Sequence, residues 1–247
     1  MNTIAALVVL AMLFIFGVVI YLMINSSRRA SEKKRQISHS LGFNTLEADA
    51  ELLERISHLY RRGDRKRTFE LRDVSRKSMP DGELVIFDLV ETSGEDDSYP
   101  EQQAVAVISD HLDLPEFLIF PKAGTEGAAA DLANRLLGWV LSKFDTPVEF
   151  PEVPEFQRRY IVTSPEPENT RRFLSQTVLR RLAQISYLTI HAYGNIFILN
   201  SIERAGKPHT YDAVNERVKQ ALDVYVVFSS YGAPTHPGMD EDNRGSD

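Results

Sequence analysis

Apolar and polar positions along the chain predict one long apolar helix followed by a mixed domain. Residues 3–24 (TIAALVVLAMLFIFGVVIYLMI) contain no charged side chain and no proline. As a helix they would be about 33 Å long at roughly 1.5 Å per residue, close to the hydrocarbon thickness of a bilayer. We therefore expect residues 1–24 to form a transmembrane helix, with Tyr21 near the headgroup region.

A cleaved signal peptide is the alternative interpretation of this segment, and it fits less well. No basic side chain precedes the apolar run, and no small-x-small cleavage site follows it. By the positive-inside rule, basic residues directly after the run predict a single-pass protein of the cell membrane with a cytoplasmic soluble domain. The same residues are candidates for contact with the lipid bilayer through anionic headgroups: Arg28, Arg29, Lys33, Lys34 and Arg35.

Beyond the apolar run, helix and strand periodicities predict an α+β domain of antiparallel strands and about four helices. Apolar stripes predict helices over residues 46–62, 124–144, 166–184 and 211–228. Strand patterns cover residues 68–74, 84–92, 104–109, 117–122, 158–163, 187–193 and 196–202. We expect the first four strands to form a meander and the last two a hairpin across Gly194-Asn195. Runs of strands followed by mixed elements favour α+β over a doubly wound parallel sheet.

Proline and charge divide the chain into segments. We expect a basic juxtamembrane linker over 25–45, a first α+β half over 46–145, a second half over 146–230 and a disordered tail over 231–247. Whether the two halves are one domain or two stays open. The tripeptide Pro-Glu-Phe at 115–117 and again at 154–156 suggests a duplicated strand–helix unit.

Composition excludes some chemistry and separates two charged regions. With no cysteine, the chain has no disulfide, no thiolate metal site and no cysteine nucleophile. The net charge of −7 combines a balance of +6 over residues 28–77 with −13 over residues 78–247. We therefore expect the basic part to orient the domain at the membrane and an acidic distal face to meet a protein partner.

Other charged clusters give weaker indications. A second basic contact with lipid, or a solvated turn, is expected at Arg61, Arg62, Arg65, Lys66 and Arg67. Nucleic acid is a disfavoured partner because the chain is acidic overall and no exposed aromatics are interleaved. The sequence Asp110-His111-Leu112-Asp113 is interpreted as a polar loop, so we expect no metal and no cofactor.

One strand offers a candidate pocket. Tyr187, His191 and Tyr193 share a face of the strand over 187–193. That face could line a pocket or be the semi-exposed side of an ordinary antiparallel strand. The chain has no Gly-x-Ser-x-Gly turn, P-loop or Gly-x-Gly-x-x-Gly. No catalytic residue is therefore assigned, and a binding or scaffolding module is favoured. The alternatives are an enzyme acting on a membrane or envelope substrate and a structural subunit of a membrane complex.

Three phrases in order carry a resemblance to a family. They are LVIFDLVETSGEDDSYPEQQAVAVIS at 84–109, LPEFLIFPK at 114–122 and FPEVPEFQRRYIVTS at 150–164. Together they resemble a set of uncharacterised bacterial membrane-anchored proteins, over residues 43–200. The resemblance implies one or two N-terminal membrane helices before this domain. It implies no activity and provides no catalytic residue.

Overall fold

The computed structural model describes residues 16, 18, 21, 25, 28–46, 50–61, 68–91, 102–122, 146–185, 189–200 and 210–231. Its described strands form one sheet, in the order β1-β2-β3-β4-β9-β8-β5-β7-β6, and every neighbouring pair is antiparallel. The strands are β1 (Asn44–Thr45), β2 (Phe69–Met79), β3 (Gly82–Glu91), β4 (Gln102–Ile108), β5 (Leu114–Pro121), β6 (Pro147–Val148), β7 (Tyr160–Thr163), β8 (Thr189–Gly194) and β9 (Ile196–Asn200). The helices are α2 (Ala50–Arg61), α4 (Pro154–Arg159), α5 (Pro167–Phe173), α6 (Gln176–Leu182) and α7 (Tyr211–Tyr231). The α+β class is as predicted.

The predicted N-terminal transmembrane helix is corrected. In the described part of the chain, no helix is long and apolar enough to cross a bilayer. Within residues 3–24, only the isolated positions 16, 18 and 21 are described, and they are helical. The expectation rested on the length and apolar character of this run alone. The prediction of a single-pass membrane protein is corrected on the same finding.

Strand order departs from the predicted meander at its fourth strand. The meander is confirmed for β2, β3 and β4, but β9 and then β8 lie between β4 and β5. The predicted hairpin across Gly194-Asn195 is confirmed, with Tyr193 opposite Ile196. Strands from both predicted halves of the chain therefore alternate within one sheet.

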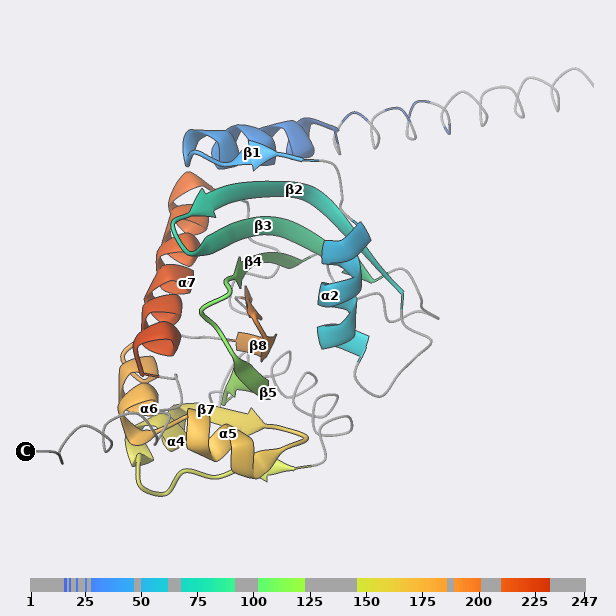
Figure 1. Ribbon diagram of the computed structural model, residues 1–247. Helices are drawn as coiled ribbons and strands as arrows, with labels where there is room; N and C mark the ends of the chain where they lie inside the picture. The colour runs from blue at the N-terminus through green and yellow to red at the C-terminus, as the bar shows by residue number, and fades with distance from the viewer. Residues whose placement is uncertain are drawn as a thin grey trace, which may run out of the picture.

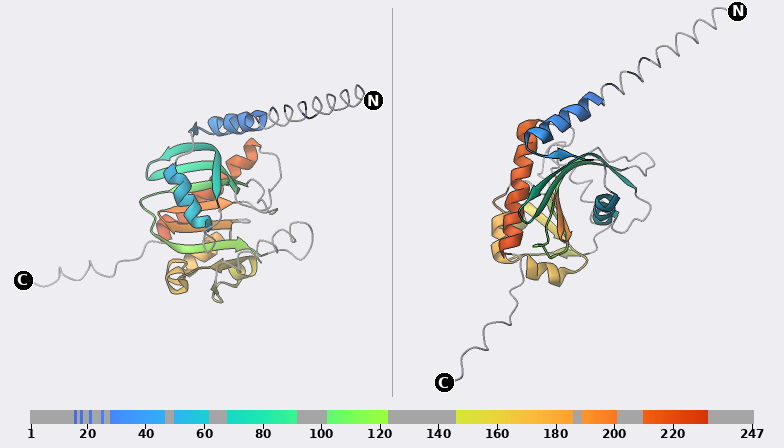
Figure 2. Two further views of the ribbon diagram at one scale, coloured as in Figure 1. Left: turned by 90° about the vertical axis from the view of Figure 1, so that its right-hand side faces the viewer. Right: turned by 45° about the horizontal axis from the view of Figure 1, so that its top comes forward.

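Alternation along the strands produces two cores, one on each face of the sheet. On β3, Leu84 and Ile86 pack in the larger core, which α4, α5, α6 and α7 cover. Val85 and Phe87 point the other way and pack under α2. Figures 1 and 2 show this arrangement, with α7 and α2 on opposite sides of a strongly twisted sheet.

Two local predictions fail for identifiable reasons. The helix expected over 166–184 is broken into α5 and α6, because Ser175 starts a new helix by accepting the Val178 N–H at 3.5 Å. The second Pro-Glu-Phe, at 154–156, opens the helix α4, whereas the first lies within strand β5. The two copies of the tripeptide therefore have different structures, and the second does not open a strand; the helix expected over 124–144 lies outside the described residues, so the duplication stays a prediction.

A helix over residues 28–40 lies against β2 and β3, within the segment expected to be a linker. Lys34 Nζ lies 2.6 Å from Asp88 Oδ2, and these side chains are 10% and 1% exposed. Ser31 donates to Asp73 at 2.6 Å, and Arg35 Nε lies 3.4 Å from the same carboxylate. Asp73 has a φ of 50°, a left-handed conformation next to the β2 bulge. The 28–40 helix is thus held against the sheet by contacts with two carboxylates, those of Asp73 and Asp88.

The turn between β2 and β3 depends on a glycine. A Cβ placed on Gly82 would lie 2.1 Å from the carbonyl oxygen of Ile108 in the neighbouring strand. Van der Waals contact is impossible at that distance, so any side chain there would force β3 and β4 apart. Asp81 also accepts a hydrogen bond from the Ser109 hydroxyl through its backbone carbonyl, which fixes the turn against β4.

Candidate functional site

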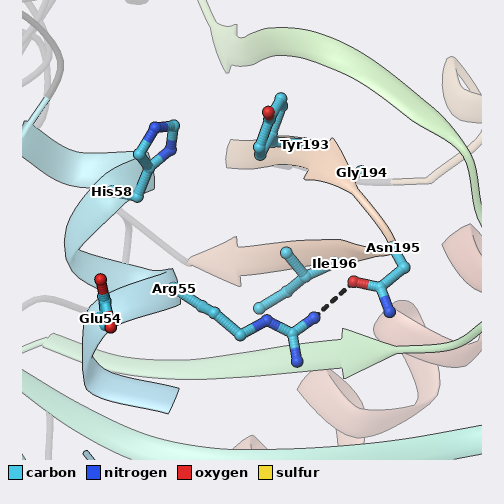
Figure 3. A pocket seen from close by; sticks show the side chains of 7 residues that line it. All are labelled: Glu54, Arg55, His58, Tyr193, Gly194, Asn195 and Ile196. Carbon is cyan, nitrogen blue, oxygen red and sulfur yellow. Dashed lines mark hydrogen bonds between the residues drawn. The ribbon is translucent and has the colours of Figure 1, made fainter. Parts of the chain in front are cut away.

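A pocket of about 290 Å³ lies between α2 and the β8–β9 hairpin (Figure 3). Its walls come from one turn of α2 and from the tip of the hairpin. The lining residues are Glu54, Arg55, His58, Tyr193, Gly194, Asn195 and Ile196. Two segments separated by well over a hundred residues in the sequence therefore build one concave site.

Arg55 provides the positive charge of the pocket. The half-buried guanidinium reaches across to the hairpin, where Nη2 donates to Asn195 Oδ1 (Figure 3). Asn195 in turn donates from Nδ2 to Asp110 Oδ1 at 3.4 Å, which fixes the orientation of its amide. Within the described residues, Arg55 forms no ion pair with a carboxylate. A neutral amide thus positions this cation without neutralising it.

The pocket also has an aromatic part. His58 stacks on Tyr193 with 5.2 Å between ring centroids and 27° between ring planes. Tyr193 keeps 46% of its surface exposed, and His58 is also exposed. Glu54, one residue before Arg55 on α2, contributes an exposed carboxylate at the edge of the pocket. The site thus combines a cation, an anion and a pair of rings.

A buried polar cluster continues from the pocket along the same seam between α2 and the sheet. The ring of Tyr60 stacks on His191 at 4.4 Å, and the Tyr60 hydroxyl accepts a hydrogen bond from Asn200 Nδ2. Burial of its hydroxyl end raises the pKa of Tyr60 far above the ordinary value, and the bond from Asn200 opposes that rise only in part. Beside them, Thr189 Oγ1 and Asn200 Oδ1 are buried without a hydrogen-bond partner.

Helix periodicity explains why α2 presents these side chains. Leu52, Ile56 and Leu59 follow the spacing of one helix face and are buried on the sheet, as predicted. Arg55 and His58, three residues apart, then lie together on the flank that faces the hairpin. Gly194 has a φ of 58°, which a two-residue hairpin turn requires. The tip of the hairpin is thereby held beside the helix.

The residues predicted for a pocket have different positions. Tyr193 lines the pocket, whereas His191 is 7% exposed and lies beneath Tyr60 rather than in the cavity. Tyr187 lies outside the described residues. The alternation along the strand therefore identified its polar face, but the cavity lies only at the end of β8 that joins the hairpin turn.

The basic residues expected to contact lipid are also split. Arg28, Arg29 and Lys33 are exposed on the 28–40 helix, while Lys34 and Arg35 form ion pairs with the sheet. Of the second cluster, Arg61 ends α2, and Arg62, Arg65, Lys66 and Arg67 lie outside the described residues. Contact with anionic headgroups stays a prediction, and so do a protein partner and a cytoplasmic location.

Basic residues are exposed on the three short helices of the second half, while the acidic distal face expected over residues 78–247 stays a prediction. Each of α4, α5 and α6 ends in a pair of basic residues. All six are exposed: Arg158, Arg159, Arg171, Arg172, Arg180 and Arg181. Cations in the last turn of a helix interact favourably with its dipole, which accounts for these positions without a ligand.

Among the described residues, no group of three or more His, Asp or Glu side chains is arranged to hold a metal ion. In the segment 110–113, the exposed His111 Nε2 lies 3.5 Å from Asp81 Oδ1. This contact joins the β4–β5 connection to the β2–β3 turn, as a polar loop would.

Sequence reasoning missed Glu54, Arg55 and His58. They carry no motif, and the contact between Arg55 and Asn195 joins positions 140 residues apart. The available signal was the polar flank of α2 beside its apolar stripe. That flank indicates a surface, and only the folded chain shows what lies opposite it.

Comparison with known proteins adds little to this geometry. No protein-family model matches the chain, and no curated protein matches its sequence. The fold is similar to the crystal structure of the mycobacterial trehalose monomycolate transport factor A, TtfA, with a TM-score of 0.46 and 12% sequence identity. The match covers 81% of this chain and 94% of that chain.

Proposed function

We propose that the protein is a ligand-binding domain whose site is the pocket between α2 and the β8–β9 hairpin. Its ligand presents a carboxylate to Arg55. The observation that carries this proposal is a half-buried guanidinium at the wall of a cavity, oriented by the Asn195 amide and lacking a carboxylate partner among the described residues.

The chemistry of the guanidinium supports a carboxylate ligand. Arginine has five N–H donors in a planar fork, and Asn195 Oδ1 occupies only part of that set. The remaining donors suit the two oxygens of a carboxylate, which accepts parallel hydrogen bonds from one guanidinium. Partial burial strengthens such a contact because less water screens it.

Binding accounts for the pocket better than catalysis. General-base and nucleophilic mechanisms need side chains joined by hydrogen bonds, with one residue orienting the next. Within the described part of the chain, Glu54, His58 and Tyr193 form no hydrogen bond with another side chain. The polar contacts that order the site run from Arg55 to Asn195 and from Asn195 to Asp110, and they hold a guanidinium, which suits a bound anion.

The size of the pocket limits the ligand. A volume of about 290 Å³ is near the lower end of the range for small-molecule sites, which is roughly 300–1,000 Å³. A carboxylate with one apolar ring fits these limits. At roughly 0.3–0.4 kcal/mol per non-hydrogen atom, such a molecule binds in the millimolar range.

Sodium 3-phenylpropionate is a suitable probe, with the Nε–H signals of the arginines followed by NMR. We expect saturable binding to the full-length chain and a shift of the Arg55 signal. Arg55→Gln should weaken binding by up to about fivefold, the upper range for one partly exposed ion pair. The matched control is Arg171→Gln, which removes an exposed arginine of α5 paired with Glu168. Equal binding by wild type and Arg55→Gln would refute the proposal, as would no binding at all.

A further inference from the structure

The pocket carries two opposite charges that do not neutralise each other. Glu54 and Arg55 both line it, and within the described residues neither forms an ion pair, with the other or with a third group. As neighbours on α2 they point in different directions: Arg55 extends toward the hairpin, and Glu54 does not (Figure 3). The formal charge of the lining is therefore zero, with its positive and negative parts separated.

This charge distribution favours a zwitterion over a simple anion. A carboxylate held by Arg55 would also experience the nearby Glu54 carboxylate, and like charges in one site repel each other. A protonated amine on the same ligand would turn that repulsion into attraction. The lining is thus complementary to a molecule with both charges.

The remaining walls suit an apolar substituent. The His58–Tyr193 stack and the side chain of Ile196 also line the cavity. Stacked or edge-on rings are favourable against such a surface. At roughly 30 Å³ for each water molecule, a cavity of about 290 Å³ holds about ten waters. A ligand of ten to twelve non-hydrogen atoms is of similar size.

We infer that the ligand is a small zwitterion, an amino acid or very short peptide with an apolar or aromatic side chain. Its carboxylate binds Arg55, its ammonium group binds Glu54, and its side chain packs beside Tyr193. This inference rests on the proposed function, because it keeps Arg55 as the anion-binding group.

Three probes with the same phenyl ring test the contribution of each ligand charge separately. They are L-phenylalanine, 3-phenylpropionate, which lacks the amine, and phenethylamine, which lacks the carboxylate. We expect phenylalanine to bind the full-length chain about three- to fivefold more tightly than either analogue, the effect of an exposed ion pair. Glu54→Gln should remove that advantage over 3-phenylpropionate. The control Glu152→Gln makes the same charge change at an exposed position outside the pocket and should leave all affinities unchanged.

The outcomes distinguish this inference from the proposed function. If 3-phenylpropionate binds as tightly as phenylalanine and Glu54→Gln changes neither, the zwitterion is refuted, while Arg55-dependent binding of the acid still supports a carboxylate site. If no probe binds, both fail. Phenylalanylglycine, whose charges are separated by a peptide bond, distinguishes the two sources. Tighter binding than phenylalanine assigns the site to short peptides, and weaker binding assigns it to free amino acids.

Discussion

The 28–40 helix gives a sharp test of how the domain is held together. In the structure, Lys34 places its ammonium group 2.6 Å from the Asp88 carboxylate, with side chains only 10% and 1% exposed. Replacing Lys34 by methionine keeps most of the side-chain volume and removes the charge. The Asp88 carboxylate then stays in the sheet without this cation.

The magnitude follows from the burial of the pair. Removing one partner of a buried ion pair typically costs about 3–5 kcal/mol. Lys34 lies at the edge of the buried region and retains some contact with solvent, so we expect the lower limit, about 3 kcal/mol. Domain stabilities are roughly 5–15 kcal/mol, so this is a large fraction of the total.

Urea unfolding of the full-length chain measures this loss. With an m value of about 2–3 kcal/mol/M, the midpoint should fall by roughly 1–1.5 M in Lys34→Met. Adding Asp88→Leu should restore much of the stability, because a well-packed apolar pair often replaces a buried ion pair without loss. Lys33→Met is the matched control, since Lys33 is the exposed neighbour. If both lysine variants shift the midpoint by less than about 0.2 M, the helix is a loosely attached linker and this reasoning fails.

Two further predictions concern stability. Tyr60→Phe should cost about 1–2 kcal/mol at pH 8, because Asn200 Nδ2 loses its acceptor. Because the pKa of Tyr60 is raised in the folded protein, the Tyr60 hydroxyl loses its proton just above pH 10 only in the unfolded chain. The free energy of unfolding of the wild type therefore falls above pH 10 by up to about 1.4 kcal/mol per pH unit. The difference in free energy of unfolding between wild type and Tyr60→Phe should therefore be smaller when urea unfolding is repeated at pH 11. An unchanged difference would contradict the raised pKa of Tyr60. Gly82→Ala should cost more than about 3 kcal/mol by thermal unfolding, because its Cβ would meet the Ile108 carbonyl at 2.1 Å. Gly194→Ala, with a φ of 58° and no atom near its Cβ, should cost only about 1 kcal/mol. If Gly82→Ala and Gly194→Ala cost the same, the backbone at Gly82 moves to relieve the contact with the Ile108 carbonyl.

Local features of the sequence predicted local structure well. The hairpin at Gly194-Asn195 is present, because a two-residue turn with a left-handed glycine specifies its own register. The start of α7 is also as predicted, with the Thr210 hydroxyl accepting the Ala213 N–H at 3.3 Å. In both cases the determining contacts lie within four residues of each other.

Relations between distant segments were not predictable from one sequence. Consecutive strands are usually neighbours, so placing β5 beside β4 was the reasonable expectation. Nothing in either strand indicates that the β8–β9 hairpin separates them. The candidate site shares this difficulty. The polar face of β8 could be recognised from its alternation, whereas the arginine opposite its tip comes from α2, 140 residues earlier.

The central position of β9 has a consequence for biosynthesis. Strand β4 ends at Ile108, but its partner β9 ends at Asn200, about 90 residues later in the chain. At roughly 5–20 residues per second, translation covers that distance in about 5–18 s. During that interval the hydrogen-bonding edge of β4 lacks its native partner, and it is rich in Ala, Val and Ile. An unpaired apolar strand edge is a template for intermolecular pairing. A nascent chain of this protein is thus most vulnerable to aggregation just before its final hairpin is made, and it depends on whatever protects that edge.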